Sequence, residues 1–206
     1  MNWNTVANDE IIEKTKKALE ANGVSVIVVE TKEQAKEKAL SLLPEKSDVM
    51  TMTSITLDET GIESSINESG NYNSVKNKLA SLSRETDQRE MQQIGAAPEW
   101  VIGSVHAVTE NGQVVIASNT GSQLPAYVYG SDHVVWVVGA QKLVKNLDDA
   151  FTRIQEYILP IETKRARKAY GLPEEWHSNV SKLVILNKEV NPQRITMILV
   201  KESLGF

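Results

Sequence analysis

Two long apolar segments constrain the fold of this chain more than any other feature. Residues 24–29 are almost entirely β-branched, and residues 133–139 form a second hydrophobic run of strand length. Uninterrupted runs of this kind are typical of strands that are buried on both faces, as in parallel sheets. A helical pattern links the first run to another strand pattern at residues 48–53. This β-α-β order predicts an α/β fold with a mostly parallel sheet and helices on its faces.

Capping signals place the first helices around these strands. Asn8 precedes an amphipathic segment, which predicts a helix over roughly residues 8–22 that packs on the sheet. Thr31 is followed three residues later by Gln34, the spacing of a capping box. The helix that this box opens is expected to end at Pro44, because proline cannot continue a helix.

The middle of the chain contains a hairpin signal. Residues 58–95 are polar and mostly helical in character. Beyond them, Asn111-Gly112 lies between two apolar segments, and this dipeptide favours a tight hairpin turn. It predicts that residues 105–109 pair with residues 113–117 as antiparallel strands inside an otherwise parallel sheet. Residues 104–109 also fit a helix, and the sequence leaves that alternative open.

The C-terminal part of the chain continues the alternation of helices and strands. A helix that opens at residues 147–150 is expected to stop at Pro160, and a basic helix follows over residues 161–170. Two more β-rich segments lie at residues 182–186 and 194–200. These segments supply the last strands of the expected sheet.

The composition is that of an ordinary globular protein. The chain has 206 residues, enough for one sizeable domain, and no linker or repeat divides residues 1–206. Its net charge of −5 gives no general attraction for nucleic acids or anionic membranes, so neither is an expected partner. The polar N-terminus has no signal-peptide core, and we expect a cytoplasmic protein. An oligomer of identical chains is compatible with the sequence, which does not determine the oligomeric state.

Several kinds of chemistry are excluded by residue type. The chain has no cysteine, which excludes disulfides, a thiolate nucleophile and an iron–sulfur cluster held by this chain alone. The three histidines show no metal-ligand spacing, so no metal site is expected. Phosphate-loop, dinucleotide and nucleophile-elbow motifs do not occur either. We therefore expect no cofactor within this chain.

A polar loop directly after an apolar strand is the first candidate for ligand binding. In open α/β sheets, ligands bind at the carboxyl ends of strands, where hydroxyl groups and a glycine can hold a phosphate or carboxylate. The alternative is a polar turn whose side chains cap their own backbone. The loop follows residues 113–117 and consists of Ser118, Asn119, Thr120, Gly121, Ser122 and Gln123.

Two further strand ends are candidates for the same crevice. Thr53 and Ser54 end the second strand pattern, and helix capping is the alternative role for their hydroxyls. Gly139 and Lys142 lie at the end of the apolar run at residues 133–139. Here the lysine would supply a cation for a carboxylate or phosphate, and a surface lysine is the alternative.

His106 and Glu110 are the candidate acid/base pair, because proton transfer needs two such groups within hydrogen-bond reach. Their spacing would bring them together on a helix, whereas a strand would place them on one face but farther apart. The alternative for the histidine is a structural, hydrogen-bonded role. Arg165, Arg167 and Lys168 fit a solvated helix face better than an anion site.

Several separated motifs occur in the order found in one protein family. Residues 100–112, 117–123 and 137–144, followed by 147–150 and the closing segment 202–206, resemble the LUD-domain family of LutC/YkgG-like lactate-utilisation proteins. The resemblance implies a single LUD domain with a three-layer, Rossmann-like α/β/α fold of the NagB/RpiA/CoA-transferase-like kind. It also implies a role in the oxidation of L-lactate to pyruvate. In such systems partner subunits carry iron–sulfur clusters, and without cysteines this chain would depend on a partner for one.

Three functional hypotheses follow. In the first, this LUD-like chain binds a small anionic metabolite or a nucleotide-like ligand at the carboxyl edge of the sheet, in a lactate-oxidation context. In the second, which rests on fold analogy alone, it is a hydrolase or transferase for a phosphorylated or acyl substrate. In the third, it is a non-catalytic assembly subunit of an iron–sulfur oxidoreductase. Whether the chain is catalytic stays open at this point.

Overall fold

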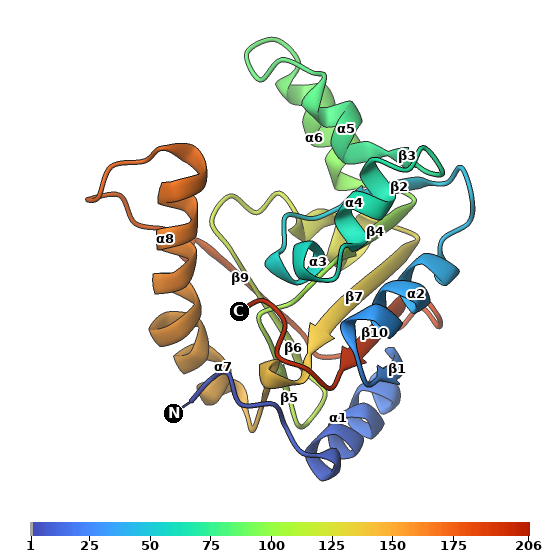
Figure 1. Cartoon of the computed structure of the whole chain (residues 1–206), viewed down its shortest axis with the longest axis vertical. Helices are drawn as coiled ribbons and strands as arrows, with labels where there is room; N and C mark the ends of the chain where they lie inside the picture. The colour runs from blue at the N-terminus through green and yellow to red at the C-terminus, as the bar shows by residue number, and fades with distance from the viewer. Residues whose placement is uncertain (1) are drawn as a thin grey trace.

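Six parallel strands form the central sheet of the molecule (Figure 1). The computed structural model describes residues 2–206. In the order β1-β10-β7-β4-β2-β3, every strand runs parallel to its neighbours, which confirms the α/β class and the mostly parallel sheet. The strands are β1 (Ser25–Val29), β2 (Asp48–Thr51), β3 (Asn73–Ser74), β4 (Trp100–Gly103), β7 (His133–Gly139) and β10 (Ile195–Val200).

The central strand β7 is buried on both faces, which explains its uninterrupted apolar sequence. Trp136 and Val138 pack into the core on one face, whereas Val135 and Val137 pack into the core on the other. Successive side chains of a strand point to opposite faces of the sheet. A strand that is covered on both sides therefore needs an apolar residue at nearly every position.

Helices cover one face of the central sheet. Ala35 and Ala39 of α2, Leu57 of α3 and Ile62 of α4 share one hydrophobic cluster with the side chains on that face. The mostly helical character expected of residues 58–95 is confirmed, and α5 and α6 project at the top of Figure 1. The helices are α2 (Lys32–Leu42), α3 (Ile55–Glu59), α4 (Ile62–Asn67), α5 (Val75–Ala80) and α6 (Gln88–Ala96).

A second sheet packs on the opposite face. Val108 and Ile116 of this sheet share a cluster with Trp136 of β7, and Ile12 and Leu19 of α1 (Asp9–Ala21) join them. Helix α1 therefore packs on the same side of the central sheet as the second sheet. The second sheet has the order β8-β5-β6-β9 and consists of β5 (Ala107–Thr109), β6 (Val114–Ser118), β8 (Leu143–Val144) and β9 (Lys182–Leu186).

The predicted hairpin is confirmed, but it lies outside the parallel sheet. Strands β5 and β6 are antiparallel, with Ala107 opposite Val115, so the helical alternative for this segment is wrong. The expectation that the pair belongs to the parallel sheet is also wrong. The reason is burial: Ile116 packs toward the central sheet, whereas Val115 and Ala117 pack toward a helix on the other side. Within the second sheet, β6 is therefore covered on both faces.

A helical segment without a break covers the outer face of the second sheet. It consists of α7 (Leu147–Arg153), the π-helical turn η3 (Ile154–Ile158) and α8 (Leu159–Tyr170). The expectation that Pro160 ends the helix is therefore wrong. This proline is the second residue of α8, directly after the π-helical turn. Proline disrupts the regular helical hydrogen bonds, and a π-helical turn is one way in which a helix continues through a local irregularity.

The first two helices begin where the capping signals place them. The Asn8 side chain accepts a hydrogen bond from the Ile11 amide at 2.9 Å, and the Thr31 hydroxyl accepts one from the Gln34 amide at 3.4 Å. These side chains satisfy amides that have no partner within the helix. Within residues 2–206, no helix is long and apolar enough to cross a membrane.

Candidate functional site

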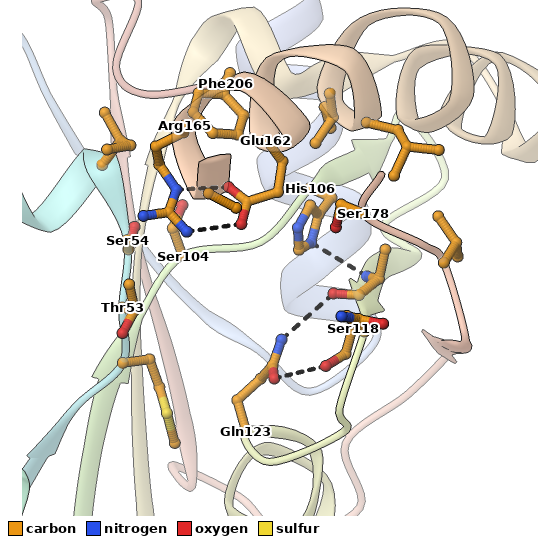
Figure 2. Close-up of a pocket in the computed structure, with 18 of the residues that line it drawn as sticks. Thr53, Ser54, Ser104, His106, Ser118, Gln123, Glu162, Arg165, Ser178 and Phe206 are labelled. Carbon is orange, nitrogen blue, oxygen red and sulfur yellow. Dashed lines mark hydrogen bonds and ion pairs between the residues drawn. The ribbon is translucent and has the colours of Figure 1, made fainter. Parts of the chain in front are cut away.

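A cavity of about 410 Å³ opens at the carboxyl end of the central sheet. The segments that follow β2, β4 and β7 form one side of it, and the loop after β6 forms another. Side chains of η3 and α8, together with residues 176–180, complete the wall (Figure 2). Ligands of α/β proteins bind at this edge of the sheet.

Most of the site residues expected from the sequence do line this cavity. Thr53 and Ser54 line it from the end of β2, and Lys142 lines it from the end of β7. The structure therefore brings together two strand ends that are far apart in the sequence. The polar loop contributes Ser118, Asn119, Thr120, Ser122 and Gln123 to the same cavity.

Two of the expected glycines do not line the cavity. Gly121 has a positive φ of 88°, and its Cα faces the side chain of Lys182. Its amide donates to the Ser118 hydroxyl at 2.8 Å, so this N–H is already used within the loop. Gly139 packs against the side chain of Gln141 and the backbone of Leu204, where a side chain would collide. Both glycines serve close packing in this structure.

The polar loop satisfies much of its own hydrogen-bonding capacity. The Ser118 hydroxyl donates to Oε1 of Gln123 at 2.8 Å, and Nε2 of Gln123 donates to the Ala117 carbonyl at 3.3 Å (Figure 2). The self-capping alternative is therefore correct for this part of the loop. The loop forms a polar wall of the cavity.

The hydroxyl of Ser54 is not used as a helix cap. Ser54 occupies the N-cap position of α3, yet its side chain makes no capping hydrogen bond. Thr53 beside it is exposed. Figure 2 shows Thr53, Ser54 and Ser104 together on one side of the cavity, opposite Ser118 and Gln123. Both hydroxyls at the end of β2 are thus available on the cavity wall.

Lys142 is the central charged group of the site, and it is not a surface lysine. The residue is only 2% exposed. Its Nζ donates to Thr56 Oγ1 at 3.0 Å and to Ser104 Oγ at 3.1 Å. Burial and, to a smaller extent, the positive charge of Arg153 lower the pKa of Lys142 to about 7, whereas Glu59 opposes the shift.

A second buried cation lies behind Lys142. Arg153 of α7 is fully buried, and its guanidinium donates to the His106 carbonyl at 2.7 Å. Its Nε and Nη2 have no hydrogen-bond partner within residues 2–206. In the same part of the chain, no carboxylate forms an ion pair with either cation. The deep end of the site is therefore electropositive.

His106 lines the cavity as a neutral imidazole. Burial lowers its pKa to about 3, with further contributions from the charges of Lys142 and Arg153. Nδ1 accepts a hydrogen bond from the Ala117 amide at 3.2 Å, so we assign the proton to Nε2. Nε2 has no hydrogen-bond partner within residues 2–206 and is a donor for a ligand.

The structure does not form the expected acid/base pair. Glu110 lies outside the cavity and forms an ion pair of 2.6 Å with Lys14 of α1. His106 immediately precedes β5 and Glu110 immediately follows it. Because these residues flank a strand instead of sharing a helix turn, they are far apart.

An ion pair on α8 forms the wall that the sequence did not predict. Nε and Nη2 of Arg165 donate to the two carboxylate oxygens of Glu162, each at 2.7 Å (Figure 2). Both residues line the cavity, so the expectation that Arg165 is on a solvated helix face is wrong. The hydrogen bonds to Glu162 raise the pKa of Arg165. The i, i+3 spacing of Glu162 and Arg165 in the sequence indicates that they can pair, but it does not indicate that the pair lies on the cavity.

Sequence reasoning also missed Thr56 and Ser104, the two hydroxyls that hold Lys142. The Thr56 hydroxyl donates to the Leu204 carbonyl at 3.2 Å, so its oxygen accepts from the lysine. The amide of Gln141 donates to the same carbonyl at 2.7 Å. These contacts join segments that lie far apart in the chain, so local sequence patterns do not predict them.

Within residues 2–206, no three His, Cys, Asp or Glu side chains lie close enough to hold a metal ion. Iron–sulfur clusters require thiolate ligands, and the sequence has no cysteine. The residues of this chain therefore do not fit an iron–sulfur cluster.

Comparison with known proteins assigns the family. The family model described as the LUD domain matches residues 12–200, which is most of the chain. The chain belongs to the LUD-domain family. The LUD domain is also similar in fold to a crystal structure of a DUF162 family protein from Deinococcus radiodurans. The TM-score is 0.56 at 12% sequence identity, covering 95% of this chain and 99% of that chain. No curated protein matches the LUD domain described here.

Proposed function

We propose that this LUD domain binds a small 2-hydroxy or 2-oxo carboxylic acid in the cavity, as part of L-lactate utilisation. The lactate context comes from the family, whose members are generally linked to this process. The binding role comes from the site itself. The proposed ligand is lactate, pyruvate or an acid of the same class.

The observation that carries the proposal is the pair of buried basic side chains, Lys142 and Arg153, which has no carboxylate partner within residues 2–206. A charge in a protein interior is strongly unfavourable unless it is paired. Lys142 is almost fully buried beside the buried Arg153, and no carboxylate of residues 2–206 pairs with either. A carboxylate ligand in the cavity supplies the missing negative charge.

The rest of the cavity suits a small organic acid. The Nε2–H of His106 and the hydroxyls of Ser54 and Ser104 provide hydrogen bonds for a carboxylate and a neighbouring hydroxyl or carbonyl oxygen. Ile154 and Ile158 line the cavity and provide apolar contacts for a carbon chain. The volume of about 410 Å³ falls within the range of roughly 300–1,000 Å³ that is usual for small-molecule sites.

The oxidation of lactate requires an electron acceptor, which we assign to a partner. Lactate loses two electrons and two protons when it becomes pyruvate. The residues of this chain do not fit an iron–sulfur cluster, because the sequence has no cysteine. In this proposal the LUD domain holds the acid, and an iron–sulfur protein partner carries the electrons.

Thermal unfolding in the presence of candidate ligands tests the proposal. A ligand that binds the folded state raises the melting temperature with increasing ligand concentration. We expect a rise with lactate or pyruvate and none with the uncharged analogue lactamide. Phosphate and sugar phosphates test the alternative that the site holds a phosphorylated substrate.

Two substitutions make the test specific to the cavity. Lys142→Met is expected to weaken acid binding at least tenfold, because a hydrogen bond to a charged group contributes about 1.5–3 kcal/mol. Lys164→Met removes an exposed lysine of α8 that does not line the cavity and is the matched control. Equal binding to both variants, or a response to sugar phosphates alone, would overturn the proposed function.

A further inference from the structure

Lys142 has one unused position on its side-chain nitrogen. Two of its N–H bonds point to Thr56 Oγ1 and Ser104 Oγ. The Thr56 oxygen must accept, because that hydroxyl donates to the Leu204 carbonyl. An ammonium group has a third N–H at the remaining position, whereas a neutral amine has its lone pair there.

The surroundings favour the neutral amine. Burial and the positive charge of Arg153 both disfavour a proton on Lys142. The neighbouring His106 is neutral, so it supplies no negative charge that would favour the proton. Glu59, which favours the proton, is exposed and forms no ion pair with Lys142. Lysine nucleophiles in proteins are activated in this way, by desolvation or by an adjacent cation.

We propose that Lys142 is a nucleophile that forms a Schiff base with the carbonyl group of a 2-oxo acid in the cavity. This inference rests on the proposed function, and it narrows the substrate class. A 2-hydroxy acid such as lactate has no electrophilic carbonyl at C2 and cannot react. A 2-oxo acid such as pyruvate, the product of lactate oxidation, can.

The step balances without any further reactant. The lone pair of the Lys142 nitrogen attacks C2 of the 2-oxo acid, and a proton moves from the nitrogen to the former carbonyl oxygen. The resulting carbinolamine loses that oxygen as water, and a C2=N bond forms. One amine and one ketone give one imine and one water, and no electrons are gained or lost. Hydrolysis by the reverse steps releases the acid unchanged.

The positions of the neighbouring groups suit this step. Ser104 and Thr56 hold the nitrogen on two sides, so the lone pair is directed away from both. Nε2–H of His106 lies on the same cavity and can donate to the departing oxygen. The charge of the buried Arg153 stabilises the carboxylate of the bound acid through space.

Reductive trapping with borohydride tests the proposal on the intact chain. Borohydride converts an imine irreversibly into a secondary amine, so a trapped 2-oxo acid adds its carbon skeleton to the protein mass. We expect one addition per chain with pyruvate and borohydride together, and none with lactate and borohydride. Peptide mapping of the wild-type protein should place the addition on Lys142.

The variant Lys142→Arg separates this chemistry from anion binding. Arginine retains the positive charge but does not form an imine under these conditions. We expect Lys142→Arg to lose trapping, while the exposed-site control Lys164→Arg retains it. Because Lys142→Arg has to fit a buried site, its melting temperature is measured in parallel, and the peptide map of the wild type gives an answer that does not depend on the variant.

The outcomes distinguish this inference from the proposed function. If pyruvate raises the melting temperature but borohydride traps nothing, the Schiff base is wrong and acid binding stands. Labelling that maps to surface lysines, or that persists in Lys142→Arg, also overturns the inference. If neither pyruvate nor lactate changes the melting temperature and nothing is trapped, both proposals are wrong.

Discussion

Lys142 lowers the stability of the folded protein, and we assign it a role in ligand binding and chemistry. Its ammonium form is buried beside Arg153, with hydroxyl groups as its hydrogen-bond partners. Such an arrangement lowers stability, since a buried charge without a counter-ion is costly. A cost of this kind is typical of functional sites, where local rules of folding are broken for a purpose.

We therefore predict that Lys142→Met stabilises the ligand-free protein while it removes acid binding. The gain in the free energy of unfolding near pH 7 should be on the order of 2 kcal/mol, net of two lost hydrogen bonds. Urea titration of both proteins measures it. A clear loss of stability would show that the lysine has a structural role instead.

The same substitution has a pH signature. The folded-state pKa of Lys142 is about 7, against an ordinary value of 10.5, so the unfolded chain binds more protons between these values. The wild type should therefore gain stability as the pH rises through this window, and the advantage of Lys142→Met should shrink. Arg153, His106 and Glu59 are the charged or titratable groups that affect this lysine, and burial lowers the pKa of Arg153 to about 10, near the upper end of this window.

His106 gives a separate prediction at acid pH. Its pKa is lowered from 6.5 to about 3, so the unfolded chain binds the extra proton first as the pH falls below 6.5. The wild type should lose on the order of 2 kcal/mol between about pH 7 and pH 4.5 because of this residue. His106→Gln should show a smaller loss over the same range, and chemical denaturation at several pH values measures both. Parallel curves for the two proteins would contradict the assignment of a neutral histidine.

At the scale of elements, the helix of residues 147–170 forms one wall of the site. Its first part packs on the second sheet through Ile154 and Ile158, and its later part presents Glu162 and Arg165 to the cavity. Both isoleucines belong to the π-helical turn η3 (Ile154–Ile158), which precedes the ion pair in the chain. A π-helical turn changes the angular position of all later side chains relative to a regular helix. The position of the ion pair therefore depends on this turn.

The start of this helix provides a test at the same scale. The Asn146 side chain accepts a hydrogen bond from the Asp149 amide at 2.9 Å and caps α7. Asn146→Ala should lower the free energy of unfolding by about 1 kcal/mol. Asn191→Ala is the matched control, because Asn191 is exposed and caps no helix within residues 2–206. Equal stability of the two variants in urea would contradict the capping role.

At the scale of the whole molecule, two sheets in face-to-face contact create the site. The loop after β6 belongs to the second sheet, whereas Ser54 and Lys142 follow strands of the central sheet. The cavity exists because the sheets end at the same side. A variant that loosens the central sheet should therefore affect both stability and ligand binding.

Ile198 in β10 and Leu183 in β9 allow a comparison of the two sheets. Ile198 is fully buried in the central sheet, whereas Leu183 is 42% exposed in the second. Ile198→Ala should lower the free energy of unfolding by about 2–5 kcal/mol, because it leaves a cavity in a packed core. Leu183→Ala should cost about 1 kcal/mol or less. Similar losses in a denaturant titration would contradict the difference in burial between Ile198 and Leu183.

Local sequence patterns were sufficient to predict the helices and strands that are determined by interactions between residues close together in the chain. The N-caps Asn8 and Thr31 act through hydrogen bonds within one helical turn, so their spacing is visible in the sequence. The apolar run of β7 predicts burial on both faces, because successive side chains of a strand point to opposite faces of the sheet. The expectation that Pro160 ends the helix is wrong because no sequence pattern indicates the π-helical turn before it.

The sequence by itself determined the parallel α/β sheet, its helices and the position of the polar loops at strand ends, since these follow from hydrophobic period and capping. The tertiary structure decided what meets in the cavity. It separated Glu110 from His106, turned Arg165 inward and placed Thr56 and Ser104 around Lys142. Such contacts join residues far apart in the chain, and burial and charge pairing depend on where the whole chain packs. Local patterns do not contain that information.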